Sequence, residues 1–332
     1  MPVLVTDKSF GVPPVGERSG TRIVIGLVNN MPDPAIRATE RQFGNLINAA
    51  AGNLDVKLRI FSLPDVPRSE SARATFLHFY EDIDELWKGG VDGLIVTGAE
   101  PQTPELAHEP YWPALTRLID WAEDNTISTI WSCLAAHAAV LHIDGIQRQA
   151  FSEKLSGVFE CVKTADHALV AGSPPQWSVP HSRHNGLRSE DLSARGYAFL
   201  TSSAEAGVDM FAKQKKSLFL FFQGHLEYDA DSLLREYVRD ITRFLKGETD
   251  VYPEMPHGYL DEEVATIFSA FRTKALRNRN ERLPAEIAGK AADGKLLNAW
   301  RSQATNIYRN WLSYLSEQKA LKQQTSQGKV PV

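Results

Sequence analysis

Hydrophobic positions in the first 131 residues follow two alternating patterns. Short continuous apolar runs, typical of strands buried on both faces of a parallel sheet, alternate with longer stretches whose apolar residues recur at helical spacing. The predicted strands cover 22–29, 56–62, 93–97 and 127–131, and the predicted helices cover 35–51, 71–84 and 110–125. This alternation predicts an α/β fold with a mostly parallel sheet flanked by helices.

After residue 150 the pattern changes. Short extended pieces at 156–163, 169–170, 176–180, 197–200 and 207–211 predict hairpins added to the sheet, and a buried strand returns at 217–222. Amphipathic helices are predicted at 231–246, 261–279 and 290–318. We therefore predict a flexible N-terminal arm (1–20), one α/β domain carrying the site (21–250), a helical extension packed on it (251–318) and a frayed polar tail (319–332).

Composition narrows the class of protein. Hydrophobic residues make up 43% of the 332 residues and charged residues 23%, as in globular proteins. The net charge of −5, without a long basic run, does not favour a nucleic-acid partner. No segment is apolar for long enough to predict a membrane span, and the first residues do not resemble a secretory signal. The two cysteines, Cys133 and Cys161, do not make a disulfide framework, so the plain interpretation is a reducing, cytoplasmic location.

The segment TISTIWSCLAAHAAVLH, which starts at Thr126, places Cys133 where a buried strand turns into a helix. A nucleophile at such a bend stands clear of the backbone, and the start of the helix favours its thiolate. Cysteine is also among the most buried residue types. On its own, Cys133 therefore fits an inert core residue as well as a nucleophile.

A base and an acid follow the strand at 217–222. Functional groups in open α/β sheets collect beyond the carboxyl ends of the strands, where His225 and Glu227 lie. In an extended segment, residues two apart point to the same side. Glu227 can then orient His225, and His225 can activate Cys133, which predicts a Cys-His-Glu triad. Taken singly, the histidine also fits a hydrogen-bonded strand end and the glutamate a solvated loop.

The segment PHSRHN, from Pro180, carries two histidines and Arg183. It fits a hydrogen-bonded loop, a metal site whose third ligand the sequence does not identify, or an arginine that binds a carboxylate. Arg239 is a second carboxylate-binding candidate, with an exposed helix arginine as the alternative. No metal is predicted.

Twelve short motifs occur in order from about residue 22 to 318. They are NNMPD at 29, TERQF at 39, DGLIVTGAE at 92, YWPAL at 111, STIWSCLAAHAA at 128, EKLSGVF at 153, PHSRH at 180, EAGV at 205, GHLEYD at 224, EYVRD at 236, and WRS and NWL around Trp300 and Trp311. In this order they resemble the homoserine O-acyltransferases of the succinyltransferase type, which have a flavodoxin-like fold of the class I glutamine amidotransferase kind.

The resemblance implies a reaction. Cys133 would accept an acyl group from acyl-CoA, either acetyl-CoA or succinyl-CoA, as a thioester, with His225 as base and Glu227 as its orienting acid. The hydroxyl of L-homoserine, or of a similar hydroxy amino acid, would then take the acyl group, as a step of methionine biosynthesis. The family further implies a homodimer with small-molecule substrates and no tightly bound cofactor.

The resemblance also implies substrate-binding residues. Backbone N–H groups near Leu134 and in the turn of Thr97, Gly98 and Ala99 would bind the oxyanion. Arg239 and Arg183 would bind the carboxylate of the amino acid and its surroundings. Asn30, at the end of the first predicted strand, would border the same site.

Two departures from the family pattern affect the substrate. The loop after Met31-Pro32 is two residues longer and lacks the family's lysine, so either Arg37 or Arg41 replaces it or the substrate differs. The position that selects the acyl group falls on Gln102. Its bulk favours a short acyl group, whereas its lack of charge would tolerate a succinyl carboxylate, and the balance leans slightly to acetyl.

The sequence leaves alternatives open for the acceptor and for the activity. Serine or another hydroxy amino acid could replace homoserine. A glutamine amidotransferase-like hydrolase is a second hypothesis, although Ser132 and Leu134 flank Cys133 where such enzymes have glycines. A binding protein without catalysis is a third. The helix at 261–279 is additional to the family pattern and is expected to form a lid or a dimer contact.

Overall fold

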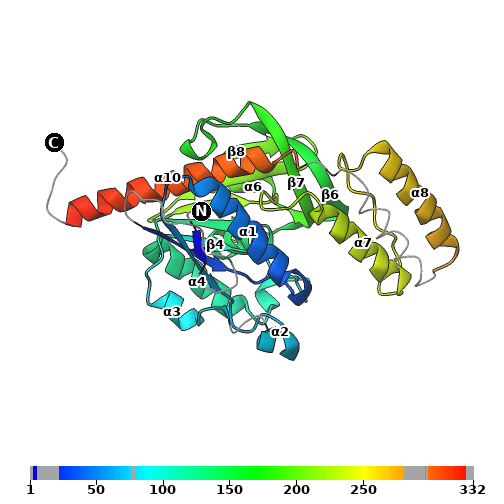
Figure 1. Cartoon of the computed structure of the whole chain (residues 1–332), viewed down its shortest axis with the longest axis horizontal. Coiled ribbons are helices and arrows are strands. Elements are labelled where there is room, and N and C mark those ends of the chain that lie inside the picture. Colours follow the sequence, from blue (N-terminus) through cyan, green and yellow to red (C-terminus); the bar gives the residue numbers. More distant parts are fainter. Residues whose placement is uncertain (1–2, 6–21, 76–78, 280–295, 297, 327–332) are drawn as a thin grey trace.

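A computed structural model describes residues 3–5, 22–75, 79–279, 296 and 298–326. Within these residues, ten strands form one sheet in the order β1-β3-β2-β4-β5-β10-β9-β8-β6-β7 (Figure 1). The parallel strands are β1 (Val3–Val5), β2 (Ile23–Val28), β3 (Val56–Phe61), β4 (Gly93–Val96), β5 (Ser128–Ser132) and β10 (Leu218–Phe222). The antiparallel strands are β6 (Gln149–Lys163), β7 (Gln176–Gly186), β8 (Ala198–Ser203) and β9 (Gly207–Gln214). The predicted parallel sheet with added hairpins is confirmed.

The described helices cover both faces of this sheet, and two of them lie beside it. The helices are α1 (Ile36–Ala51), α2 (Glu70–Thr75), α3 (Ile83–Trp87), α4 (Trp112–Asn125), α5 (Leu134–Asp144), α6 (Ser189–Ala194), α7 (Ser232–Leu245), α8 (Glu262–Arg277) and α10 (Arg301–Ser326). Neighbouring strand residues face opposite ways. Ile130 of β5 therefore joins the core under α1 and α10, whereas Trp131 joins the core under α4 and α5. The continuous apolar runs in the sequence reflect this burial on both sides.

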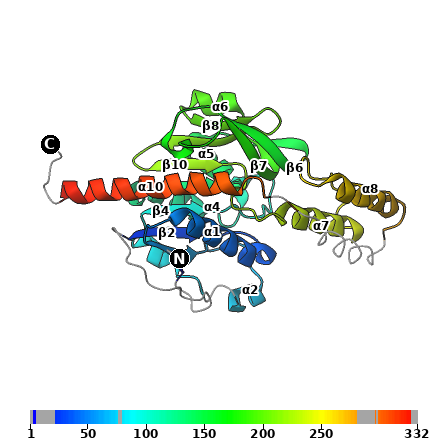
Figure 2. The same ribbon diagram turned by 45° about the horizontal axis from the view of Figure 1, so that its top comes forward.

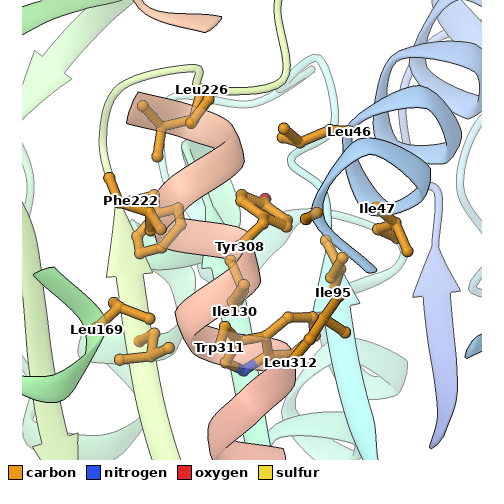
Figure 3. Close-up of a cluster of buried hydrophobic side chains, with 14 of the residues drawn as sticks. Leu46, Ile47, Ile95, Ile130, Leu169, Phe222, Leu226, Tyr308, Trp311 and Leu312 are labelled. Atoms are coloured by element: carbon orange, nitrogen blue, oxygen red, sulfur yellow. The ribbon is translucent and has the colours of Figure 1, made fainter. Parts of the chain in front are cut away.

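Helix α10 packs on the sheet through fully buried aromatic side chains (Figure 3). The Trp311 indole N–H donates to Ser128 Oγ at 3.0 Å. A Cβ at Gly93 would lie 2.7 Å from Leu315 Cδ1 and 2.9 Å from the Trp311 ring, so only a glycine lets the helix approach this closely. The C-terminal extension therefore contributes to the main core.

Several boundaries differ from those predicted. The helix expected at 71–84 divides into α2 and α3, and Glu81 N–H instead donates to Ile60 O at the end of β3. The extended piece at 169–170 is a 3-10 turn, η4 (Ala168–Val170). The arm at 1–20 contains β1, which pairs with β3. The tail expected to fray from Lys319 is helical to Ser326. Lys319 Nζ binds Asp92 Oδ2 at 2.8 Å, which anchors this part of the helix.

Helices α7 and α8 form an arm beside the sheet (Figure 2). They share a small core of their own, which includes Tyr237, Phe244, Val264 and Phe268. Asp261 caps α8, because its Oδ1 accepts from the N–H of Val264 at 2.8 Å. Across the described helices of the chain, none is both long and apolar enough to cross a membrane.

Candidate active site

Cys133 lies at a strained bend between β5 and α5. Its φ of 53° and ψ of −115° are unusual for a residue other than glycine. Such conformations cost about 1–3 kcal/mol and cluster at functional sites. The Cys133 N–H donates to Phe222 O at 2.7 Å, which ties the bend to the end of β10. The side chain is partly exposed, as a nucleophile must be.

His225 and Glu227 follow β10 in a turn. The prediction that this segment is extended is wrong, because Tyr228 N–H donates back to His225 O at 3.2 Å. The turn still brings the two side chains together, with His225 Nδ1 2.7 Å from Glu227 Oε1. The backbone N–H of His225 donates to Pro180 O at 2.8 Å, and the Tyr228 ring stacks on the imidazole with centroids 4.2 Å apart. Two backbone hydrogen bonds therefore fix the turn, and two contacts, from Glu227 and from the Tyr228 ring, hold the imidazole in one orientation.

The electrostatics of His225 connect it to Cys133. Burial disfavours its imidazolium, but the charge of Glu227, the charge of Cys133 and hydrogen bonds to both raise the pKa of His225 well above its usual value. The structure thus brings Cys133, His225 and Glu227 together in the predicted order. This arrangement favours the charged imidazolium of His225 next to the cysteine.

The turn after β4 lies against the start of α5. A Cβ at Gly98 would be 2.8 Å from Leu134 Cβ and 3.1 Å from Leu134 N, so a glycine is needed there. The first N–H groups of a helix have no partner within it. The N–H of Leu134 therefore has no partner within α5, and its role toward an oxyanion stays a prediction. Thr97 Oγ1 accepts from the N–H of Asn30 at 2.8 Å and fixes the turn.

A mostly apolar pocket opens beside Cys133. It is lined by Asn30, Thr97, Gly98, Ala99, Leu106, Tyr111, Trp112, Leu115, Leu134, Ala135 and Ala138. Five of the predicted site residues are therefore brought together here. Gln102 is not among the lining residues. It is exposed, and its N–H donates to Glu109 Oε1 at 2.7 Å.

The two predicted arginines have different surroundings. Arg183 is buried, and its guanidinium donates to Asn185 O at 2.7 Å, to Ala206 O and to His181 Nδ1 at 3.4 Å. Its side chain thus ties β7 to the turn between β8 and β9. Arg239 lies on α7 with 47% of its side chain exposed, 2.9 Å from Asp240 Oδ1. Arg239 is the more accessible of the two to a substrate carboxylate.

A charged cluster beside the triad was not identified from the sequence. Lys154 Nζ lies 3.2 Å from Glu236 Oε2 and 2.8 Å from Asp240 Oδ2. The Tyr228 hydroxyl donates to Glu236 Oε1 at 2.5 Å, and Ser182 Oγ donates to Glu236 Oε2. Tyr228 stacks on His225 and bonds to Glu236, so its side chain connects this cluster to His225. The motifs EKLSGVF and EYVRD contain Lys154 and Glu236, but spacing alone gave them no role.

The loop arginines that were expected to replace the family's lysine bind carboxylates of the chain. Arg41 Nη2 lies 3.0 Å from Asp229 Oδ2, two residues after Glu227. Arg37 Nη1 lies 3.0 Å from Glu40 Oε2. Neither side chain lines the pocket. Arg68 holds the loop by donating to Asn29 O at 3.2 Å and to Met31 O.

Cys161, His181 and Asp209 form a buried trio whose side-chain types could hold a metal. Arg183 Nε donates to His181 Nδ1, so in the neutral ring Nε2 carries the proton. That nitrogen lies 3.4 Å from Asp209 Oδ1. Metal ligation needs the unprotonated nitrogen. With its proton on Nε2, the neutral ring offers no lone pair to a metal on the side that faces Asp209.

Comparison with known proteins gives a family match. Residues 17–321 match the family model described as homoserine O-succinyltransferase. The homoserine O-succinyltransferase of Rhodopseudomonas palustris is 49% identical, covering 89% of each chain. That of Bradyrhizobium japonicum is 46% identical, covering 93% of this chain and 96% of the relative. A solved glutamine amidotransferase from Methylobacillus flagellatus is 14% identical with a TM-score of 0.49, covering 89% of this chain and 96% of that one.

Proposed function

We propose that this chain, which belongs to the homoserine O-succinyltransferase family, transfers a succinyl group from succinyl-CoA to the hydroxyl of L-homoserine in methionine biosynthesis. The observation that carries the chemistry is Cys133 at a strained bend beside the His225–Glu227 pair. The names of the relatives support succinyl over the acetyl group that Gln102 slightly favoured.

In the first half-reaction, the Cys133 thiolate attacks the thioester carbonyl of the acyl-CoA. The resulting oxyanion is stabilised by the N–H of Leu134 and by the turn at Gly98. The carbon–sulfur bond to CoA then breaks, and the imidazolium of His225 protonates the departing thiolate. The acyl group remains on Cys133 as a thioester, and His225 is left neutral.

In the second half-reaction, the hydroxyl of the amino acid attacks this thioester. Neutral His225 takes the hydroxyl proton, while Glu227 holds the ring through Nδ1 and stabilises its charge. Collapse of the intermediate releases the Cys133 thiolate and the O-acyl amino acid. We assign the carboxylate of the acceptor to Arg239, because the N–H groups of Arg183 are bonded within the protein.

Intact-protein mass spectrometry tests the proposal. Succinyl-CoA without acceptor should add one succinyl mass to the wild type and none to Cys133→Ala, and homoserine should remove it. Cys161→Ala is the matched control, because Cys161 is fully buried and should leave the labelling unchanged. Absence of an acyl-enzyme, together with hydrolysis of glutamine, would instead favour the amidotransferase-like hydrolase.

The acceptor and the assembly need separate measurements. Release of CoA with homoserine, serine and other hydroxy amino acids ranks the acceptors. A cytoplasmic homodimer is our proposal from the family resemblance, and light scattering after size exclusion tests the dimer. A monomer that retains full activity would contradict the dimer and leave the chemistry in place.

A further inference from the structure

A third arginine, Arg148, lies near the nucleophile in the loop between α5 and β6. Its Nη2 donates to Pro104 O at 3.0 Å, which links it to the loop beside the pocket. Arg148 is half-buried, and burial lowers its pKa, while the charges of Tyr111, Glu109 and Cys133 act in the opposite direction. The guanidinium therefore lies within electrostatic range of the Cys133 sulfur.

The charge of Arg148 is incompletely compensated. A guanidinium has five N–H donors, and within the described part of the chain one is taken, by Pro104 O. No described carboxylate lies within ion-pair distance of it. Burying a charge without a partner is costly unless an anion is supplied. A cation of this kind next to a catalytic group is expected to meet the anion of a substrate.

Two buried polar atoms beside Arg148 also lack partners among the described residues. They are the hydroxyl of Tyr111, which is 3% exposed and lines the pocket, and Oε2 of Glu109. The other oxygen of Glu109 accepts from the N–H groups of Gln102 and Thr103 at 2.7 and 2.8 Å. A buried hydroxyl without a protein partner leaves a donor that a ligand, an ion or water can satisfy.

We propose that Arg148 and the Tyr111 hydroxyl bind the terminal carboxylate of a dicarboxylic acyl group carried on Cys133. The carboxylate accepts from the guanidinium and from the phenol, while the methylene carbons of the acyl chain lie against the apolar pocket wall of Leu134 and Ala138. This inference rests on the proposed acyl transfer and specifies its donor.

In this proposal Arg148 and Tyr111 select the acyl group, and the Gln102 side chain does not. The Gln102 side chain is exposed, and its backbone positions Glu109. Glu109 is held in turn by the backbone N–H groups of Gln102 and Thr103. A carboxylate bound at Arg148 then lies between guanidinium and hydroxyl, and the acyl groups of monocarboxylic acids leave both unpaired. Selectivity arises because leaving those polar groups without a hydrogen-bond partner costs free energy when a monocarboxylic acyl group is bound.

The experiment compares two donors of equal chain length, succinyl-CoA and butyryl-CoA, which differ in the terminal carboxylate. Acyl-enzyme formation is followed by mass spectrometry and CoA release, giving kcat/KM for each donor. We expect Arg148→Met to lower the succinyl-to-butyryl ratio of kcat/KM by roughly 30–100-fold, as for loss of charged hydrogen bonds. Tyr111→Phe should lower the ratio by roughly 10–30-fold, as for loss of one hydrogen bond to a charged group.

Three controls separate the outcomes. Arg272→Met, on the arm and paired with Glu254, should leave the ratio unchanged. Arg148→Lys, which retains the charge, should recover part of the ratio, and thermal unfolding checks that each variant is folded. Equal losses with both donors would overturn the proposal in favour of a general CoA contact. A wild type that uses butyryl-CoA as well as succinyl-CoA would overturn it while acyl transfer stands. No acyl-enzyme with either donor would refute the proposed function, and this inference with it.

Discussion

The two cysteines have similar neighbouring residue types, a histidine and an acid, but differ in exposure and in backbone conformation. Cys133 has His225 and Glu227 beside it, and Cys161 has His181 and Asp209. Cys133 is partly exposed at a strained bend, whereas Cys161 is fully buried inside β6. Residue types alone would not distinguish the two trios.

Electrostatics distinguish them. Around Cys133, the nearby charges raise the pKa of His225 well above its usual value despite burial. Around Cys161, burial lowers the pKa of His181 well below its usual value, and the charges of Arg183 and His225 act in the same direction. Burial also raises the pKa of the Cys161 thiol far above its usual range. Neighbouring charge favours the imidazolium of His225, whereas burial favours the neutral ring of His181, so exposure and neighbouring charge distinguish the two sites.

The largest expected effect is at Cys133. Cys133→Ala should lower acyl transfer by at least about 10³-fold, because both half-reactions pass through the thiolate. Brief treatment of the folded wild type with iodoacetamide near neutral pH should modify Cys133 and spare Cys161, as read by peptide mass spectrometry. Modification of Cys161 at a similar rate would contradict the contrast between the two sites.

Removing the acid should weaken the first trio without dismantling it. Glu227→Gln should lower kcat by about 10²–10⁴-fold, because the amide cannot stabilise the imidazolium. The pKa of His225 should fall, since the charge of Glu227 is one of the groups that raise it. The pH dependence of iodoacetamide alkylation then moves toward that of an ordinary thiol. An unchanged profile would remove Glu227 from the triad.

The second trio should affect stability with pH. Burial raises the pKa of Asp209 to about 6, from 3.8. A raised carboxyl pKa in the folded state gives stability at low pH that is lost as pH rises from 3.8 through about 6. Asp209→Asn removes this loss. Between pH 4 and 7, the free energy of unfolding of the variant should rise by about 3 kcal/mol relative to that of the wild type, since each pKa unit is worth about 1.4 kcal/mol.

Urea unfolding across that pH range measures this change. The diagnostic quantity is how the difference in unfolding free energy between variant and wild type changes with pH. Any hydrogen bond from Thr201 that the amide loses adds only a constant offset to this difference. His181, whose protonation acts in the opposite direction, is present in both proteins. A difference that does not vary with pH would mean that Asp209 is ionised throughout.

The smallest effect is expected at Cys161. Cys161→Ala removes a buried sulfur and should cost about 1–2 kcal/mol of unfolding free energy, within the usual range for a small core truncation. Acyl transfer at saturating substrate should stay within about 3-fold of wild type. A loss of activity comparable to that of Cys133→Ala would erase the distinction between the trios.

The sequence predicted the parts of the fold that local burial encodes. The strands β2, β3, β4, β5 and β10 follow the predicted apolar runs within two residues, and helices α1, α4, α7 and α8 follow the predicted amphipathic stretches. A strand buried on both faces must be apolar throughout, so its pattern is legible without its neighbours. Boundaries set by distant partners were missed, as at Lys319, which binds Asp92.

Within the candidate site, the sequence identified the chemistry and the tertiary structure decided the geometry. Cys133, His225 and Glu227 follow from their positions at strand ends, and the ordered motifs give the family. The turn at His225, the burial of Arg183 and the approach of Arg148 to Cys133 were not predictable from spacing. Long side chains in loops reach partners far along the chain, and no local periodicity records where they end. The sequence therefore determined which groups are candidates for the chemistry, while only the fold decided which candidate arginine is buried and which is exposed.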